Sequence, residues 1–236
     1  MGREQRRRAP RASVEVCVYC GLEQGTTKDH VPPRALFPVP RPADLVRVPC
    51  CETCRKPQGA DDEYFKYMTV LRRDVAHSVV GARLVQSVLR GLARPQSQRL
   101  TASLVRSFRS LEVRTAAGLY IGHAAAYEAN LLRSNAVMRR TLLGLYYHET
   151  GTRLPDSHCA LAYSVAGLSG SDPTVNALLQ RLVKFGTSGK VRVIGQGVFI
   201  YAWQAFPDEP HVTVWLFLIY SQVVYMGFTI KREDHP

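Results

Sequence analysis

Residues 17–65 are the most informative part of this chain: they read C-V-Y-C-G at 17–21, T-K-D-H-V-P-P at 27–33, V-P-C-C-E-T-C at 48–54 and D-D-E-Y-F at 61–65. Two Cys-x-x-Cys knuckles enclose an Asp-His dipeptide. Each knuckle is spaced so that one tight turn points both thiols at the same ion. This pattern predicts a structural metal site beside a pair of chemically reactive side chains.

Four cysteines are expected to bind one zinc ion, namely Cys17, Cys20, Cys51 and Cys54. Four thiolates in tetrahedral geometry suit Zn²⁺, and a site closed by four protein ligands is structural rather than catalytic. Because so short a module buries little core, the metal would supply much of its folding free energy.

Two alternatives stay open for the cysteines. Cys50 could replace Cys51 with one more residue of spacing, although the two-residue gap favours Cys51. A disulfide framework would use the same residues, but no apolar export segment precedes them, which favours zinc. Cys159 stands alone and is expected to be a small apolar filler.

The motifs at 17–21, 27–33 and 48–54 resemble the HNH endonuclease family, in the bacterial branch with a T-K-D-H-[IV]-P-P core. The resemblance implies a zinc-stabilised ββα-metal module that hydrolyses phosphodiester bonds. It implies that Asp29 binds a catalytic divalent cation, such as Mg²⁺, and that His30 is the general base. Imidazole suits that task because its ordinary pKa lies near neutrality.

The remaining family positions match less well. Asp44 stands where the family has a middle Asn that buttresses the loop carrying the catalytic His, and Asp can accept but not donate hydrogen bonds. Arg55 stands where many relatives have Asn or His. The missing metal ligand is expected among Asp61, Asp62 and Glu63, with Asp62 assigned here. The alternative is that these carboxylates favour the start of a helix.

The formal net charge of +12 predicts a polyanionic partner, and nucleic acid is the commonest one. A GC-rich coding sequence would also enrich arginine. The net charge therefore supports nucleic-acid binding only in combination with the nuclease-like motif. Double-stranded DNA is the expected substrate. The residues expected to contact it are Arg3, Arg6, Arg7, Arg8, Arg11, Lys28, Arg55 and Lys56.

The predicted fold class is α+β, in four segments. These are a disordered basic arm at 1–13, the zinc module at 14–75, a helical region at 76–150 and an α+β region at 151–236. Apolar spacing predicts a helix from Asp61 or Asp62 through Val79, closed by Pro95. The further elements expected are helices at 97–110, 127–149 and 172–185, a hairpin at 111–122, and an antiparallel meander of strands at 191–194, 197–205, 212–220 and 223–230.

Further features of the chain bear on its location, its helix ends and its assembly. The apolar stretch 212–230 is long enough to span a membrane, but its β-branched and aromatic content favours two strands. His148 and Glu149 are interpreted as a helix terminus capped by Gly151 rather than as a catalytic pair. A cytoplasmic protein is expected, and the C-terminal region is a candidate for homo-oligomerisation.

The sequence therefore predicts a metal-dependent endonuclease with structural Zn²⁺ and a catalytic divalent cation. The rival hypothesis is a non-catalytic zinc module that binds nucleic acid or another protein. A carboxylate that converges on Asp29 and His30 would favour the enzyme.

Overall fold

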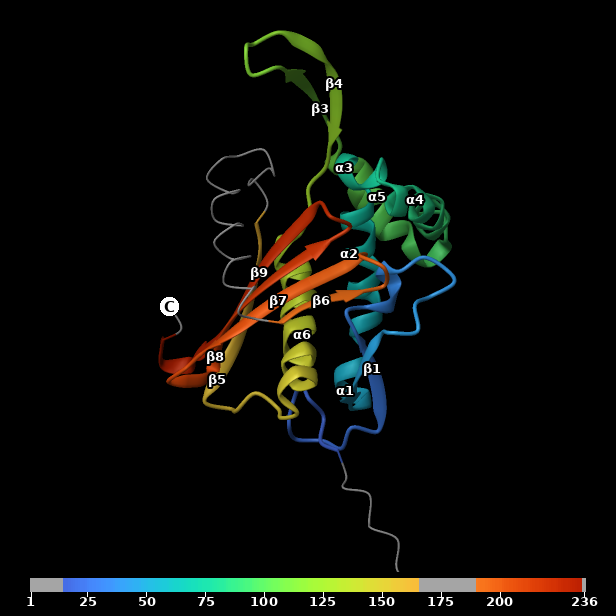
Figure 1. Cartoon of the computed structure of the whole chain (residues 1–236). Helices are drawn as coiled ribbons and strands as arrows, with labels where there is room; N and C mark the ends of the chain where they lie inside the picture. Colours follow the sequence, from blue (N-terminus) through green and yellow to red (C-terminus); the bar gives the residue numbers. More distant parts are fainter. Residues whose placement is uncertain (1–14, 166–189, 235–236) are drawn as a thin grey trace, which may run out of the picture.

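The computed structural model describes residues 15–165 and 190–234. Within these residues the protein is a mixed α+β structure that ends in a five-stranded antiparallel sheet (Figure 1). The basic arm at 1–13, with its five arginines, and the helix expected at 172–185 lie outside the described residues.

The N-terminal part is a β-hairpin followed by helices. The hairpin pairs β1 (Thr27–Val31) with β2 (Val46–Cys50), and the short helix η1 (Arg34–Leu36) lies in the connection between these strands. The short helix α1 (Glu52–Arg55) and the longer α2 (Gln58–Val70) follow β2. The register sets Asp29 opposite Val48 and His30 opposite Arg47. The knuckles therefore lie next to the hairpin that carries the Asp-His pair.

Helix α2 begins at Gln58, earlier than the predicted start at Asp61 or Asp62. Pro57 precedes it with a φ of −73°. A proline ring fixes a helical φ, and it lacks the N–H that the first turn of a helix leaves unbonded. The proline therefore starts the helix, and Asp61 lies in its first turn, where the helix dipole favours a carboxylate.

The helix expected to continue from α2 through Val79 is broken twice, which corrects the prediction. The pieces are α2, α3 (Arg73–Ala76) and α4 (Val79–Leu92). Arg72 and Ser78 both have extended backbones, and the Ser78 hydroxyl accepts a hydrogen bond from Gly81 N at 3.0 Å. This cap starts α4 afresh, and it leaves Val79 exposed instead of on the apolar face.

Two further elements close the helical region. Pro95 opens a 3-10 turn, η2 (Pro95–Ser97), and α5 (Gln98–Ser107) ends before the predicted residue 110. The predicted hairpin is confirmed as β3 (Arg109–Arg114) and β4 (Tyr120–Ala126), which project from the body of the molecule (Figure 1). The segment 76–150 is thus helical with a two-stranded interruption.

Helix α6 (Leu131–Thr150) joins the N-terminal part to the sheet. Its ends follow the expected chemistry, since the Asn130 side chain caps the first turn and Gly151 ends the helix with a φ of 72°. Gly144 permits a close approach to β1, because a Cβ there would lie 2.5 Å from Cγ1 of Val31. The helix also contacts β2, α2 and β5 (His158–Ser164).

The C-terminal sheet has the order β5-β9-β8-β7-β6. The predicted meander is confirmed by β6 (Lys190–Ile194), β7 (Phe199–Phe206), β8 (Glu209–Ile219) and β9 (Val223–Lys231). The apolar stretch 212–230 thus forms two strands, and none of the described helices is long and apolar enough to cross a membrane. Edge strand β5 was not predicted, because alanine and serine have little strand preference.

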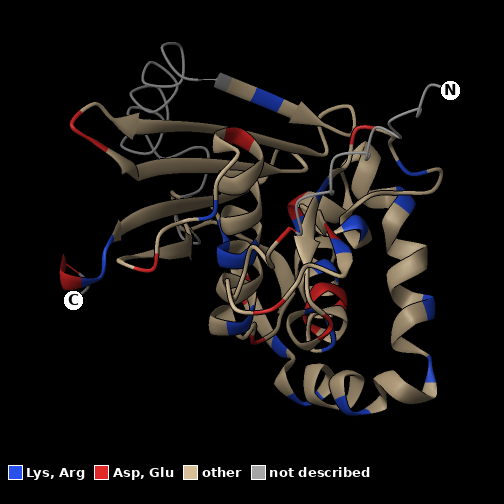
Figure 2. Cartoon of the chain, turned by 90° about the horizontal axis from the view of Figure 1, so that it is seen from below, with Lys and Arg blue, Asp and Glu red and all other residues tan. Residues whose placement is uncertain are grey.

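One continuous cluster of buried side chains links the hairpin, α2, α6 and the sheet. It includes Val31 of β1, Phe65 of α2, Leu142 of α6 and Trp215 of β8. The middle of the sheet carries few charges, whereas basic segments recur along the helices (Figure 2). Charged side chains therefore gather on the hairpin and helices, and the sheet packs against α6 through β5 and β9.

Candidate metal centre and adjoining charged pocket

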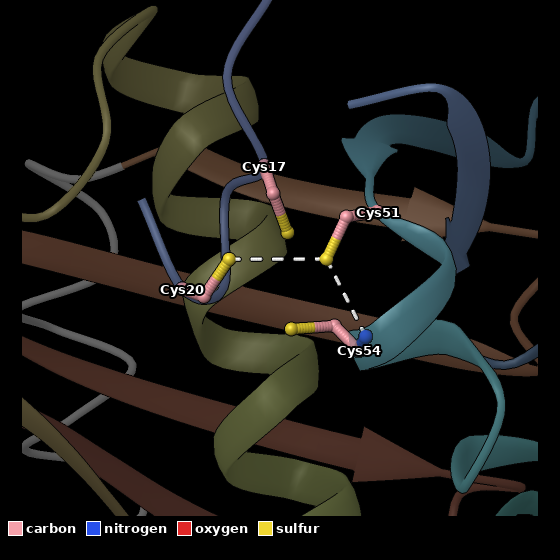
Figure 3. Close-up of side chains that lie close together, drawn as sticks. All are labelled: Cys17, Cys20, Cys51 and Cys54. Carbon is pink, nitrogen blue, oxygen red and sulfur yellow. Dashed lines mark hydrogen bonds between the residues drawn. The ribbon is translucent and has the colours of Figure 1, made fainter. Parts of the chain in front are cut away.

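The four predicted zinc ligands converge. The Sγ atoms of Cys17, Cys20, Cys51 and Cys54 all lie within 4.8 Å of one another, and Figure 3 shows the four side chains pointing at a common centre. Cys51 is the N-cap of α1, and its sulfur accepts a hydrogen bond from Cys54 N at 3.4 Å. Four thiols at this spacing could hold a metal such as zinc.

Local backbone geometry prepares the first knuckle for a metal. Gly21 has a φ of 69°, which a residue with a side chain rarely adopts, and its N–H donates to Cys17 O at 2.9 Å. Burial alone would raise the pKa of Cys20, but hydrogen bonds from the backbone of Glu23 and Leu22 lower it to about 7. Backbone donors thus favour the thiolate that a metal requires.

Cys50 is not part of this cluster. Its thiol donates to its neighbour's carbonyl, Cys51 O, at 3.3 Å, and the sulfurs that converge are those of Cys17, Cys20, Cys51 and Cys54. The structure therefore selects Cys51 over Cys50 as the fourth ligand. All six cysteines are free, so the disulfide alternative has no support, and Cys159 is half-buried on β5.

The Asp-His pair lines a pocket of about 390 Å³ on the neighbouring surface. Asp62 of α2 lines the same pocket. The complete lining is Lys28, Asp29, His30, Arg34, Glu52, Arg55, Lys56, Gln58, Gly59 and Asp62. Six residues singled out in the sequence therefore meet in one place, three as candidate chemical groups and three as cations.

Asp29 is held by a dense set of contacts. Its Oδ2 accepts a hydrogen bond from the Tyr19 hydroxyl at 2.6 Å, and its Oδ1 accepts one from His30 N at 2.9 Å. Nε of Arg140, on α6, lies 3.5 Å from Oδ2. These contacts fix the carboxylate in one orientation.

Arg140 joins the two carboxylates of the pocket. Its Nη2 donates to Asp62 Oδ1 while its Nε faces Asp29, and its side chain is only 12% exposed. Burial raises the pKa of Asp62 to about 6, even though Arg140 acts in the opposite direction. The buried Nε of Arg140 makes no hydrogen bond within the described residues. Asp29 and Asp62 thus share one cation.

His30 has a pKa below its ordinary value. Burial is the largest cause, and the nearby charges of Arg34 and Arg47 lower the pKa further. The charge of Asp29 raises it, but by less. The imidazole is therefore neutral near pH 7, when its nitrogen lone pair can accept a proton.

The other acidic candidates point elsewhere. Asp61 pairs with Arg133, and Glu63 accepts a hydrogen bond from Tyr67. Asp44 accepts a hydrogen bond from Gly195 N at 3.2 Å, which ties its loop to the turn between β6 and β7. Asp44 does not line the pocket around His30.

The His148–Glu149 pair belongs to the end of α6, as interpreted from the sequence. The Glu149 carboxylate is 4% exposed and accepts hydrogen bonds from Tyr201 at 2.8 Å and Arg192 at 3.1 Å. His148 is exposed. Glu149 thus anchors the helix to the sheet.

Sequence reasoning missed Tyr19 and Arg140. Tyr19 lies inside the first knuckle, where the two-residue spacing predicts a turn and says nothing of the intervening side chains. Arg140 follows another arginine on a helix far along the chain, so only the packing of α6 reveals it.

Comparisons with protein-family models, curated proteins and solved structures find no significant match to this chain.

Proposed function

We propose that this protein is a metal-dependent endonuclease of the HNH type that hydrolyses phosphodiester bonds of nucleic acid, with DNA as the substrate. One observation carries the proposal. Asp29 and His30, neighbours on β1, line the same pocket as a third chemical group, Asp62, from a separate helix. The convergence of a carboxylate on the Asp-His pair is what a catalytic site of this type requires and what a plain zinc module does not.

The surroundings of the pocket agree with an anionic substrate. Lys28, Arg34, Arg55 and Lys56 line it together with the three chemical groups. Phosphates bind where cations gather, and a desolvated cleft strengthens their attraction. The order of elements also agrees with the HNH resemblance, because a β-hairpin is followed by a helix and the four-cysteine cluster lies at its base.

His30 has the role of general base. The attacking water loses its proton to the imidazole as its oxygen forms a bond to phosphorus and the bond from phosphorus to the 3′ oxygen breaks. Hydrogen bonding to the His30 backbone holds the carboxylate of Asp29 beside this base. A positioned base of this kind contributes roughly 10²- to 10⁴-fold to the rate.

The donor set fits a divalent cation that prefers oxygen ligands. Asp29 and Asp62 would hold it, since both carboxylates line the pocket and no cysteine is among the lining residues. When bound, such an ion stabilises negative charge on the departing oxygen as a Lewis acid. The buried guanidinium of Arg140 keeps the two carboxylates near each other while it offsets their mutual repulsion.

Zinc in the four-cysteine cluster has a structural role in this proposal. It would clamp the loop of Cys17 and Cys20 to α1, which follows β2. Tyr19 lies in the clamped loop and donates to Asp29. Loss of zinc would therefore disturb the carboxylate as well as the fold.

The same arginine supports a second candidate, a zinc-stabilised module that binds nucleic acid without cutting it. Arg140 contacts both Asp29 and Asp62, so the pair could be a structural ion cluster with no metal. In that case the basic pocket would only hold a phosphate.

Supercoiled plasmid incubated with Mg²⁺, Mn²⁺, Ni²⁺ or Zn²⁺ separates the two candidates. We expect the wild-type protein to nick plasmid with at least one cation and His30→Ala to lose that activity. The matched control is His148→Ala, which removes an exposed histidine near the C-terminal end of α6 that does not line the pocket. Failure of the wild-type protein to nick with every cation would leave the binding module as the function.

A further inference from the structure

A second and larger hollow opens beside the candidate active pocket. It has a volume of about 810 Å³ and shares Arg34, Gly59 and Asp62 with that pocket. We call it the basic groove and define it by its cations, which are Arg34, Arg41, Lys66, Arg83 and Arg90. A chain leaving the active pocket past Arg34 would pass directly into this groove.

The carboxylates in the groove do not neutralise its cations. Its acidic residues are Asp62, which pairs with Arg140, and Glu63, which accepts a hydrogen bond from Tyr67. Within 15–165 and 190–234, no carboxylate oxygen lies within ion-pair distance of any of the five cations. The groove is therefore a concave surface with an excess of positive charge and no direct ion pair to its five cations.

The cations are close enough to repel one another. Lys66 is half-buried, and its Nζ donates to the Ser87 hydroxyl at 2.8 Å. Burial is the main reason that the pKa of Lys66 is lowered; the charge of Glu63 opposes the shift, and the nearby charges of Arg41, Arg94 and Arg90 add to it. Like charges held together in this way are unfavourable in the free protein, and a bound polyanion would relieve them.

The spacing on α4 suits a repeating anion. Arg83, Ser87 and Arg90 follow one another at helical positions i, i+4 and i+7, so they share one face. Seven residues of helix rise by about 10 Å, which is close to three steps of roughly 3.4 Å, the spacing of one strand's phosphates measured along the axis of duplex DNA. Two arginines at this separation can contact two phosphates of one backbone.

The groove also has an apolar wall. Pro38 and Val39 line it beside the arginines, and Val39 is 81% exposed. An isolated phosphate has no apolar part, whereas the sugars of a nucleic-acid strand can cover such a surface. The combination favours a sugar–phosphate backbone over a small anion.

We propose that the basic groove binds the sugar–phosphate backbone of the DNA strand that flanks the scissile phosphate. That the bound strand leads to a scissile phosphate rests on the proposed nuclease function. Binding of DNA in the groove can be measured without cleavage. Arg83 and Arg90 of α4 are the phosphate contacts farthest from His30 along the chain, and Arg34 is the contact shared with the active pocket.

The test compares two double variants that remove the same charge. Arg83→Ala with Arg90→Ala changes two exposed arginines in the groove, and Arg114→Ala with Arg232→Ala changes two arginines outside it. All variants are made in the His30→Ala background with zinc bound and no other divalent cation added. Fluorescence anisotropy then measures affinity for a labelled 20-base-pair duplex and for its single strand between 50 and 300 mM salt.

We expect the groove variant to bind at least tenfold more weakly at 100 mM salt and to reduce the slope of log affinity against log salt by about 2, one for each phosphate contact. The control should lose less than threefold and keep the slope. Replacing both groove arginines with lysine should restore most of the slope. Thermal unfolding verifies that every variant is folded.

Equal losses in the groove and control variants would overturn the proposal, because net charge alone would then explain binding. Absence of binding by the parent protein would overturn it as well. If the groove behaves as expected but wild-type protein cuts no DNA with any cation, the groove stands and the nuclease proposal fails. The two proposals therefore fail separately.

Discussion

Replacing Arg140 with methionine should destabilise the protein more than any other single loss of charge. Arg140 is 12% exposed, lies 3.5 Å from Asp29 and pairs with Asp62, which is also mostly buried. Removing the guanidinium leaves two buried carboxylates facing each other without a cation. Loss of one partner from a buried ion pair costs about 3–5 kcal/mol of unfolding free energy.

The helix offers a matched control in the adjacent residue. Arg139→Met removes the same charge from an exposed position of α6, where substitutions usually change stability by about 0.5 kcal/mol or less. Urea unfolding of both variants, measured at pH 7 with saturating zinc and no other metal, gives the difference directly. The slope of the transition verifies that both variants unfold from a similar fold.

A second comparison tests the cause of the loss. Adding Asp29→Asn and Asp62→Asn to Arg140→Met removes the two buried carboxylate charges that lack a cation, so the triple variant should recover a large part of the lost stability. A divalent cation should likewise stabilise Arg140→Met more than wild type, since ligand binding to the folded state raises its stability. The reasoning is refuted if Arg140→Met is no less stable than Arg139→Met.

Further outcomes follow from the cysteine cluster and from Glu149. Elemental analysis should find about one zinc per chain in wild type and in Cys50→Ser but not in Cys51→Ser, and a folded wild-type protein without metal would contradict this assignment. Burial alone would raise the pKa of Glu149, but hydrogen bonds from Tyr201 and Arg192 outweigh it and lower that pKa. Its stabilising contribution is therefore present above the ordinary glutamate pKa of about 4.3 and is lost as the pH falls below it. Glu149→Gln should accordingly lower the unfolding free energy by about 1.5–3 kcal/mol at pH 7, with the gap to wild type narrowing as the pH falls below about 4.3, and a gap independent of pH would contradict this assignment.

Features set by short-range spacing were predictable. The knuckle spacing selected all four clustered cysteines, because a two-residue gap directs both thiols of a turn to one point. The alternation of apolar residues in 191–230 predicted four strands of the sheet, and Gly151 predicted the end of α6. In each case the physical cause lies within a few residues of the feature.

Features set by long-range packing were not predictable. Arg140 reaches Asp29 and Asp62 only because α6 lies against β1 and α2. The break at Ser78 depends on a local cap that apolar spacing does not reveal. The groove joins arginines of α4 to Arg34 of η1 and to Arg41, both in the segment that connects β1 to β2.

The single-turnover cleavage rate of a labelled DNA duplex measures the proposed chemistry of the pocket itself. With zinc-loaded protein in excess over DNA and Mg²⁺ or Mn²⁺ added, the rate reports chemistry and not affinity. We expect cleavage by wild type and a loss of roughly a hundredfold or more in His30→Ala, with the affinity for DNA nearly unchanged. Equal rates for the two proteins would mean that the pocket formed by Asp29, His30 and Asp62 is not where the bond is cut.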